Sequence, residues 1–205
     1  MARTHSNGGE RSAIEMLLQD HKRVQKLFKD FEKIDRGDEE AVRELVETAC
    51  LELQIHSMLE EELFYPAVRA QAQGESEDLL NEAEVEHEAA DDLIARLHEL
   101  EPDDAMYCAY FSVLAEYVKH HVREEEHELF PKVAQMKLDL QKLGEDMRLR
   151  REELFAEMER QDEESDEGEV AQRGLAQPGE VPTPEPEEEE LEDEQEQIDI
   201  SRTRH

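Results

Sequence analysis

The apolar residues of this chain recur every three or four positions, and polar residues interrupt every apolar run. This spacing is typical of amphipathic α-helices that bury one face, and no stretch shows the alternation of a half-buried strand. Four long segments carry the pattern, at about residues 12–34, 38–73, 75–100 and from 106 onward, and a further helical pattern covers residues 136–160. The sequence therefore predicts an all-α protein.

Local signals mark where the predicted helices begin and bend. Ser12 is followed three residues later by Glu15, which is a capping-box pattern, and Gly74 closes the second segment. Pro66 and Pro131 each fall deep inside a helical pattern, so we expect both to kink or end a helix. Short connections between long amphipathic helices predict an antiparallel four-helix bundle.

One segment of the chain occurs twice. His56 opens the sequence HSMLEEELFYP and His121 opens HVREEEHELFP. Each places a glutamate four residues after the histidine, Glu60 and Glu125, and a proline ten residues after it. Residues four apart lie one turn apart on the same helical face, so each pair can direct two side chains at one point.

An acid–histidine pair precedes each copy of this segment. His21 stands 35 residues before His56, and His87 stands 34 residues before His121. His21 is three or four residues from Leu17 and Val24, so we expect it to face the core. The duplication predicts a pseudo-twofold relation between the first two and the second two helices. On the fourth helix, the apolar stripe leading to the histidine is interpreted as Met106, Tyr110, Val113 and Tyr117.

Four core-facing histidines and two core-facing glutamates indicate a metal site. A single histidine on an apolar face is more often a packing residue, but burying two carboxylates without a cation would be very costly. Mixed nitrogen and oxygen donors suit iron or manganese, and the absence of thiolates disfavours structural zinc. The predicted metal ligands are His21, His56, Glu60, His87, His121 and Glu125.

The other acids and histidines near the repeats have a simpler interpretation. A solvated helical face is the expectation for Glu61, Glu62, Glu124, Glu126 and Glu128. No role in the site is assigned to His5, His98, His120, His127 and His205.

Charge limits the possible partners and divides the chain. The formal net charge is −34, which repels phosphate backbones and argues against nucleic acid or an anionic membrane as the main partner. Residues 161–205 hold 17 acids, three arginines and no aromatic residue, so a disordered acidic tail is predicted there, with an unknown protein partner or none. The expected divisions are a bundle over 11–135, an additional helix over 136–160 and this tail.

The location of the protein is expected to be cytoplasmic. The first ten residues contain no apolar signal region, and no stretch approaches the roughly 20 apolar residues of a membrane helix. The two cysteines, Cys50 and Cys108, have no redox or zinc spacing and are interpreted as small buried side chains in a reducing compartment.

The paired H-x-x-x-E-E motifs, with their trailing Leu-Phe and Pro, resemble those of the hemerythrin-like, or HHE cation-binding, family over residues 11–135. The resemblance implies a hemerythrin-like bundle with a non-haem di-iron centre, that is, two iron ions, with manganese as the alternative metal. The four histidines would be terminal ligands and the two glutamates would bridge. It also implies reaction with a small diatomic or peroxide ligand, in a response to oxidative stress or iron.

One position departs from the oxygen-carrying hemerythrins, which place two histidines four apart on the third helix. Here Asp91 stands four residues after His87. The departure favours reaction with oxygen, peroxide or nitric oxide over reversible oxygen carriage. Peroxide disproportionation, iron or oxygen sensing through the acidic tail, and oxygen storage remain as alternatives, and so does Asp91 as an additional ligand.

Overall fold

The computed structural model describes residues 11–174, and every regular element in that part of the chain is helical. Residues 1–10 and 175–205 lie outside it, which includes most of the predicted tail. The elements in chain order are α1 (Ala13–Phe31), α2 (Glu39–Leu59), the π-helical turn η1 (Glu60–Phe64), α3 (Tyr65–Arg69), α4 (Glu75–His98), α5 (Tyr107–Glu124), the π-helical turn η2 (Glu125–Leu129), α6 (Phe130–Val133) and α7 (Leu140–Gly174).

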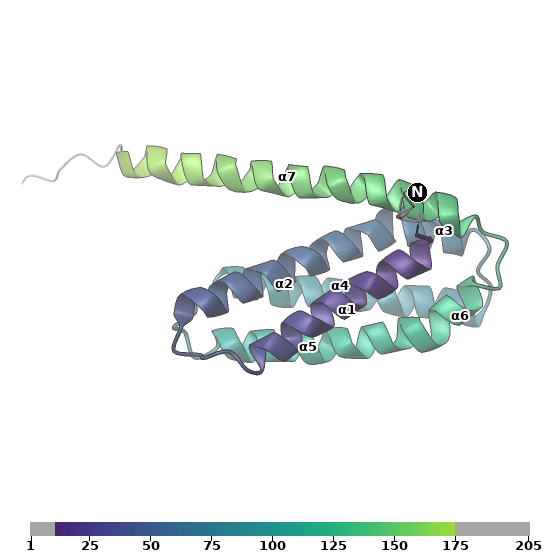
Figure 1. Ribbon diagram of the computed structural model, residues 1–205, viewed down its shortest axis with the longest axis horizontal. Helices are drawn as coiled ribbons and strands as arrows, with labels where there is room; N and C mark the ends of the chain where they lie inside the picture. The colour runs from purple at the N-terminus through teal and green to yellow at the C-terminus, as the bar shows by residue number, and fades with distance from the viewer. Residues whose placement is uncertain (1–10, 175–205) are drawn as a thin grey trace, which may run out of the picture. The chain divides into compact units, whose positions relative to one another are not determined.

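Four long helices, α1, α2, α4 and α5, run alongside one another and form the predicted bundle (Figure 1). Two apolar clusters fill its core. One cluster surrounds Phe28, Phe31 and Phe111, and the other surrounds Leu59 and Phe64. On α1, His21 lies between Leu17 of the second cluster and Val24 of the first, so a polar layer separates the two apolar ends of the core.

The predicted helix starts are confirmed where the sequence carried a capping signal. The Ser12 side chain accepts from the Glu15 backbone N–H, and the Glu15 carboxylate accepts from the Ser12 backbone N–H, which completes a capping box at the start of α1. Gly74 precedes α4 with a φ of 56°, a left-handed conformation that glycine adopts at little cost.

The two motif prolines interrupt the regular α-helix as expected, but the chain continues through a π-helical turn and the helix does not end there. In η1 the Tyr65 backbone N–H donates to the Glu60 carbonyl five residues back, and in η2 the Phe130 N–H donates to the Glu125 carbonyl. Pro66 and Pro131 then open the short helices α3 and α6, where the lack of an N–H costs nothing. Each π-helical turn begins at a predicted ligand, and such turns often occur at functional sites.

The buried face of α5 differs from the predicted stripe. Met106 and Val113 are exposed, whereas the buried apolar residues are Tyr107, Phe111, Leu114, Ala115, Val118 and Val122. His121 lies three and seven residues after Val118 and Leu114, so the true stripe is the one that continues the face of this histidine.

The C-terminal helix α7 begins near the predicted segment but extends further. It runs from Leu140 to Gly174, past Arg160, where the acidic tail was expected to begin. Of the 14 residues of α7 after Arg160, seven are Glu, Gln or Ala, which are good helix formers, and the next proline is Pro178. The part of α7 up to Asp162 belongs to the same compact unit as the bundle. None of the helices described is long and apolar enough to span a membrane.

Candidate metal centre

All six predicted ligands lie in the polar layer of the bundle, and all are buried. α1, α2, α4 and α5 each contribute one histidine, and the two π-helical turns each begin with a glutamate. The exposed fractions range from 0% for Glu60 to 6% for His121. Helical periodicity brings each side chain inward, and the bundle brings the four faces to one level.

Each glutamate contacts one histidine from each half of the duplication. Glu60 Oε2 lies 3.2 Å from His56 Nε2 and 3.4 Å from His87 Nε2. Glu125 Oε2 lies 3.2 Å from His21 Nε2 and 3.5 Å from His121 Nε2. The two carboxylates therefore join the halves across the pseudo-twofold axis.

These contacts define two overlapping sets of donor atoms. In each set, one donor atom per residue lies within 4.8 Å of all the others. The first set is His21, His56, Glu60 and Glu125, and the second is Glu60, His87 and His121. Glu60 belongs to both, and the Nε2 atoms of His87 and His121 are 3.2 Å apart. Two cations sharing a carboxylate fit this pattern.

The chemistry of the donor set fits such cations. Among the residues described, four inward-facing atoms are buried without a hydrogen-bond partner: His21 Nε2, His56 Nε2, Glu60 Oε1 and Glu125 Oε2. Buried polar atoms are normally paired, and an unpaired carboxylate in the core is costly. A bound cation would satisfy all four.

The electrostatics of the layer favour positive charge. Burial lowers the pKa of His21, but the nearby Glu125 carboxylate outweighs it and raises that pKa to about 9. Burial is likewise overcome at His87, where Glu60 and Glu61 raise the pKa to about 10. Burial raises the pKa of Glu125, yet His121 and His21 hold it well below its usual range. Protons and metal cations therefore compete for the same donors.

Two acids of the predicted solvated face also hold histidines of the centre. Glu126 Oε1 lies 3.0 Å from His21 Nδ1, and Glu61 Oε1 lies 2.8 Å from His87 Nδ1. The Glu61 side chain is 45% exposed and that of Glu126 is 28% exposed, so both acids do meet solvent as predicted, but each also reaches a histidine on a neighbouring helix. A carboxylate on Nδ1 places the proton there and leaves Nε2 free to face the centre.

The other two histidines are met by the acids of the acid–histidine pairs. Glu86 Oε2 lies 2.8 Å from His121 Nδ1. Asp20 Oδ2 lies 3.6 Å from His56 Nδ1, just beyond hydrogen-bonding distance. Every imidazole thus has a carboxylate on its outer side. The sequence carried the signal for this, since each of the four acids adjoins a predicted ligand.

The remaining acids and histidines lie outside the buried layer. Glu62 pairs with Arg150 of α7 at 2.6 Å, and Glu124 pairs with the exposed His120 at 3.3 Å. With Glu86, these last two form a third, surface group of potential donors. Exposed positions are also found for Glu128, His98 and His127, while His5 and His205 fall outside the part of the chain described.

Tyr65 is a residue of the centre that the sequence analysis did not identify. It is 1% exposed, and its hydroxyl donates to Glu125 Oε1 at 3.1 Å. Glu60 Oε2 and His87 Nε2 each lie 3.4 Å from the same hydroxyl. The second copy of the motif has Phe130 at this place, stacked on His21. The tyrosine therefore breaks the twofold pattern, and aligning the two motif copies would have revealed it.

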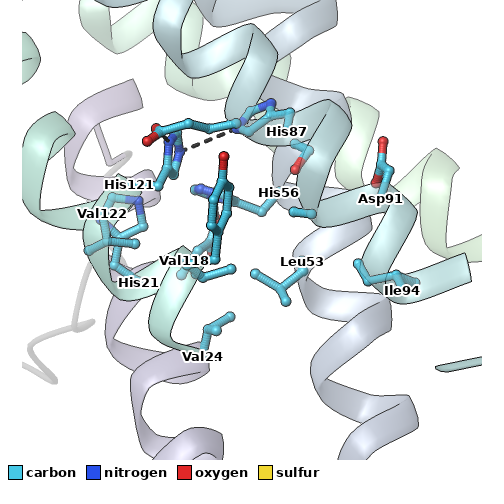
Figure 2. Close-up of a pocket in the computed structure, with 15 residues that line it drawn as sticks. His21, Val24, Leu53, His56, His87, Asp91, Ile94, Val118, His121 and Val122 are labelled. Carbon is cyan, nitrogen blue, oxygen red and sulfur yellow. Dashed lines mark hydrogen bonds and ion pairs between the residues drawn. The ribbon is translucent and has the colours of Figure 1, made fainter. Parts of the chain in front are cut away.

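A small cavity adjoins the histidines. Figure 2 shows His21, His56, His87 and His121 gathered at one end, with the aliphatic side chains of Val24, Leu53, Ile94 and Val118 beyond them. Its volume is about 20 Å³, above the roughly 10–15 Å³ that one water needs. The cavity therefore has room for a molecule of about that size.

Asp91 lies at the margin of this cavity. It lines the wall on α4 but is exposed, and it belongs to neither of the buried donor sets. Burial and then the charge of Glu61 raise its pKa above the usual value.

Comparisons with known proteins agree with this geometry. A family model described as Hemerythrin HHE cation binding domain matches residues 12–133. The fold is similar to the crystal structure of a hemerythrin HHE cation binding domain-containing protein from Mycobacterium kansasii, with a TM-score of 0.59 and 26% sequence identity. That alignment covers 70% of this chain and 87% of the other. A search of curated proteins gave no match.

Proposed function

Since the chain belongs to the hemerythrin HHE cation-binding domain family, we propose that its bundle holds two iron ions in a non-haem centre that reacts with small oxidants. The observation that carries the proposal is the pair of overlapping donor sets with Glu60 in common. His21, His56, His87 and His121 would be terminal ligands, and Glu60 and Glu125 would bridge. Manganese accepts the same donors and is the alternative metal.

The chain's own residues divide the work. The two ions would supply electrons and open coordination positions to an oxidant. Glu61, Glu86 and Glu126 orient the imidazoles through Nδ1, so that each Nε2 faces the centre. The Tyr65 hydroxyl stays protonated inside the layer, because burial and then the charges of Glu125 and Glu60 raise its pKa well above the usual value, so it is available as a hydrogen-bond donor.

The cavity supports small oxidants as the ligand class. Its volume of about 20 Å³ suits oxygen, peroxide or nitric oxide and excludes organic substrates of ordinary size. Val24, Leu53, Ile94 and Val118 form an apolar part of its wall, which offers water no hydrogen-bond partner. An apolar wall of this kind accommodates uncharged diatomic molecules more readily than ions.

Metal analysis after anaerobic reconstitution with iron tests the centre itself. We expect close to two iron atoms per chain. Zinc alone, or no metal after reconstitution, would contradict the proposal.

Exposure of the reduced, iron-loaded protein to oxidants tests the reactivity. We expect rapid oxidation in air, because Asp91 stands where a further imidazole would be needed to retain oxygen. Asp91→His should slow this oxidation if the new ring reaches the centre. Oxygen that is bound for hours and released under vacuum would instead identify a carrier or store, and steady oxygen evolution from peroxide would identify a disproportionating enzyme.

A further inference from the structure

Helix α7 lies outside the family-matched residues 12–133, yet it reaches the metal centre. Arg151 Nη1 donates to Asp20 Oδ1 at 2.6 Å, and Nη2 makes a second contact to Asp20 Oδ2. Asp20 is 2% exposed, and the Arg151 side chain is 14% exposed. A two-point contact of this kind fixes a carboxylate in orientation as well as in charge.

Asp20 in turn faces His56. Its Oδ2 lies 3.6 Å from His56 Nδ1, a buried nitrogen without a hydrogen-bond partner among the residues described. The opposite nitrogen, His56 Nε2, faces Glu60 in the centre. A cation on Nε2 requires the proton on Nδ1, and that proton requires an acceptor. Asp20 is placed to be this acceptor, and Arg151 holds it there.

A second arginine lies farther from this carboxylate. Arg23 Nη2 is 3.6 Å from Asp20 Oδ1, but its Nη1 is engaged by Glu52 at 2.7 Å. Arg151 is therefore the cation in closest contact with Asp20.

The other half of the duplication has no such contribution from α7. The counterpart of Asp20 is Glu86, which contacts His121 directly at 2.8 Å and lies 3.8 Å from the exposed His120. The remaining outer acids, Glu61 and Glu126, come from the π-helical turns of the bundle itself. Among the residues described, only the histidine of α2 has an outer acid that is hydrogen-bonded to a side chain of α7.

Helix α7 packs against the bundle at specific positions on both sides of Arg151. A Cβ at Gly144 would lie 2.2 Å from the Arg11 carbonyl oxygen, so only glycine permits this close approach to the start of α1. Met147 and Leu154 are 0% and 1% exposed and belong to the apolar cluster beside the centre. These positions place Arg151 between two buried anchors, one turn from each.

We propose that α7 contributes to the metal centre. When α7 packs on the bundle, Arg151 holds Asp20 and Asp20 orients His56, so packing of α7 is coupled to cation binding in the His21–His56 half. The inference rests on the proposed metal function. Coupling between two equilibria is reciprocal, so cation binding must also favour docking of α7 to the same extent.

The effect of α7 on cation binding is tested by titrating the full-length chain with iron(II) under anaerobic conditions, with binding measured by calorimetry. Arg151→Met should lower the affinity for one of the two ions by about 10–100-fold, since loss of a group that orients a metal ligand has effects of this size. The affinity for the other ion should stay within about twofold of the wild-type value. The matched control is Arg150→Met, which removes the contacts of the adjacent arginine to Glu62 and Glu157 but leaves Asp20 held. Both ions should then bind as in the wild type.

Three results separate the possibilities. Equal binding of both ions by the wild type and Arg151→Met would overturn the inference while leaving the metal function intact. Equal weakening in both arginine variants would also overturn it, because Arg151 would then serve only to anchor α7. A wild-type chain that binds no cation would overturn the inference together with the proposed function. Should Arg151→Met fail to fold, Arg151→Lys keeps the charge but not the two-point contact and should still weaken one ion.

Hydrogen exchange of the same proteins tests the reverse direction without any activity. Loading with iron(II) should slow exchange of backbone amides at residues 140–158 in the wild type and in Arg150→Met, and should slow it much less in Arg151→Met. If hydrogen exchange of the α7 backbone amides in the wild type is the same with and without iron(II), the coupling is refuted.

Discussion

At the scale of single residues, each imidazole of the centre is held on two sides. Its inner nitrogen faces a carboxylate that spans both halves, and its outer nitrogen faces an acid from another helix or π-helical turn. Such double support fixes both the ring orientation and the tautomer, which leaves little freedom for rearrangement when a cation binds.

The two central glutamates should behave differently from the histidines. Removing a shared carboxylate affects both cations, so we expect Glu60→Ala or Glu125→Ala to reduce iron content toward zero. His21→Ala or His87→Ala should lower it mainly toward one atom per chain. Metal analysis with optical spectra measures the difference, and full loading with an unchanged spectrum in both glutamate variants would disprove bridging.

Tyr65 should matter for reactivity more than for loading. Tyr65→Phe copies the residue already present at the equivalent place, Phe130, so the fold should tolerate it. We expect two iron atoms per chain but a peroxide or oxygen reaction slowed by about 10–100-fold, since one positioned hydrogen-bond donor to developing charge contributes up to about 10²–10³-fold. Stopped-flow spectra of the reduced variant measure the rate. An unchanged rate would assign the hydroxyl a packing role alone.

Proton competition gives the metal-free protein a distinctive pH dependence. The raised pKa values of His21 and His87, about 9 and about 10, mean that their protonated forms stabilise the metal-free fold. That contribution is complete below the unfolded pKa of about 6.5 and is lost as the pH rises through 9 to 10.

We therefore expect the melting temperature of the metal-free protein to fall between about pH 7 and 10, measured by circular dichroism. Cation affinity should change in the opposite sense and rise with pH, because the ligands must lose their protons. A melting temperature that climbs across this window would contradict the assignment.

At the scale of elements, how far the sequence predicts the structure depends on how local the signal is. The helices and the starts of α1 and α4 follow from apolar spacing, the capping box and Gly74. All six predicted ligands reach the buried layer because the repeat and its four-residue spacing reflect the helical period.

Contacts between helices were harder to foresee. Glu61 follows Glu60 and points about 100° away from it on an ordinary helix, which suggests solvent. The carboxylate instead meets His87 of α4, and the spacing along α2 carries no information about that neighbour. Arg151 is 131 residues from Asp20, so no local pattern could connect them.

Helix α7 should contribute substantially to stability through its buried face. Leu154 is 1% exposed, so Leu154→Ala should destabilise the fold by about 2–5 kcal/mol. Leu149 lies on the same helix and is 45% exposed, so Leu149→Ala should change the free energy of unfolding by less than about 0.5 kcal/mol. Urea denaturation of both variants compares them, and equal effects would show that α7 is not packed as described.

At the scale of the whole molecule, the chain combines a duplicated bundle, a helix that closes on it and a strongly acidic C-terminal region. The net charge of −34 is distributed over both parts, since the first 160 residues hold 40 acids and 20 Lys or Arg. The cation centre therefore lies in a molecule whose field concentrates cations near its surface.

The acidic region should be dispensable for the centre. Truncation after Arg160 retains both the buried Leu154 and Arg151, which contacts Asp20. We expect the melting temperature to stay within about 3 °C and iron loading to remain at two atoms per chain, as measured by calorimetry and metal analysis. A large fall in either would mean that the region beyond Arg160 supports the bundle.

The close approach of Gly144 to the start of α1 has a consequence for folding. A chain that repeats itself offers a following helix two similar places to dock, one on each copy, and the wrong choice gives a misfolded state of nearly equal energy. Gly144 fits against the Arg11 carbonyl, and Arg151 pairs with Asp20, an aspartate whose counterpart in the other copy is the longer Glu86. These contacts let α7 distinguish the two copies, so that the duplicated sequence still has a single native arrangement.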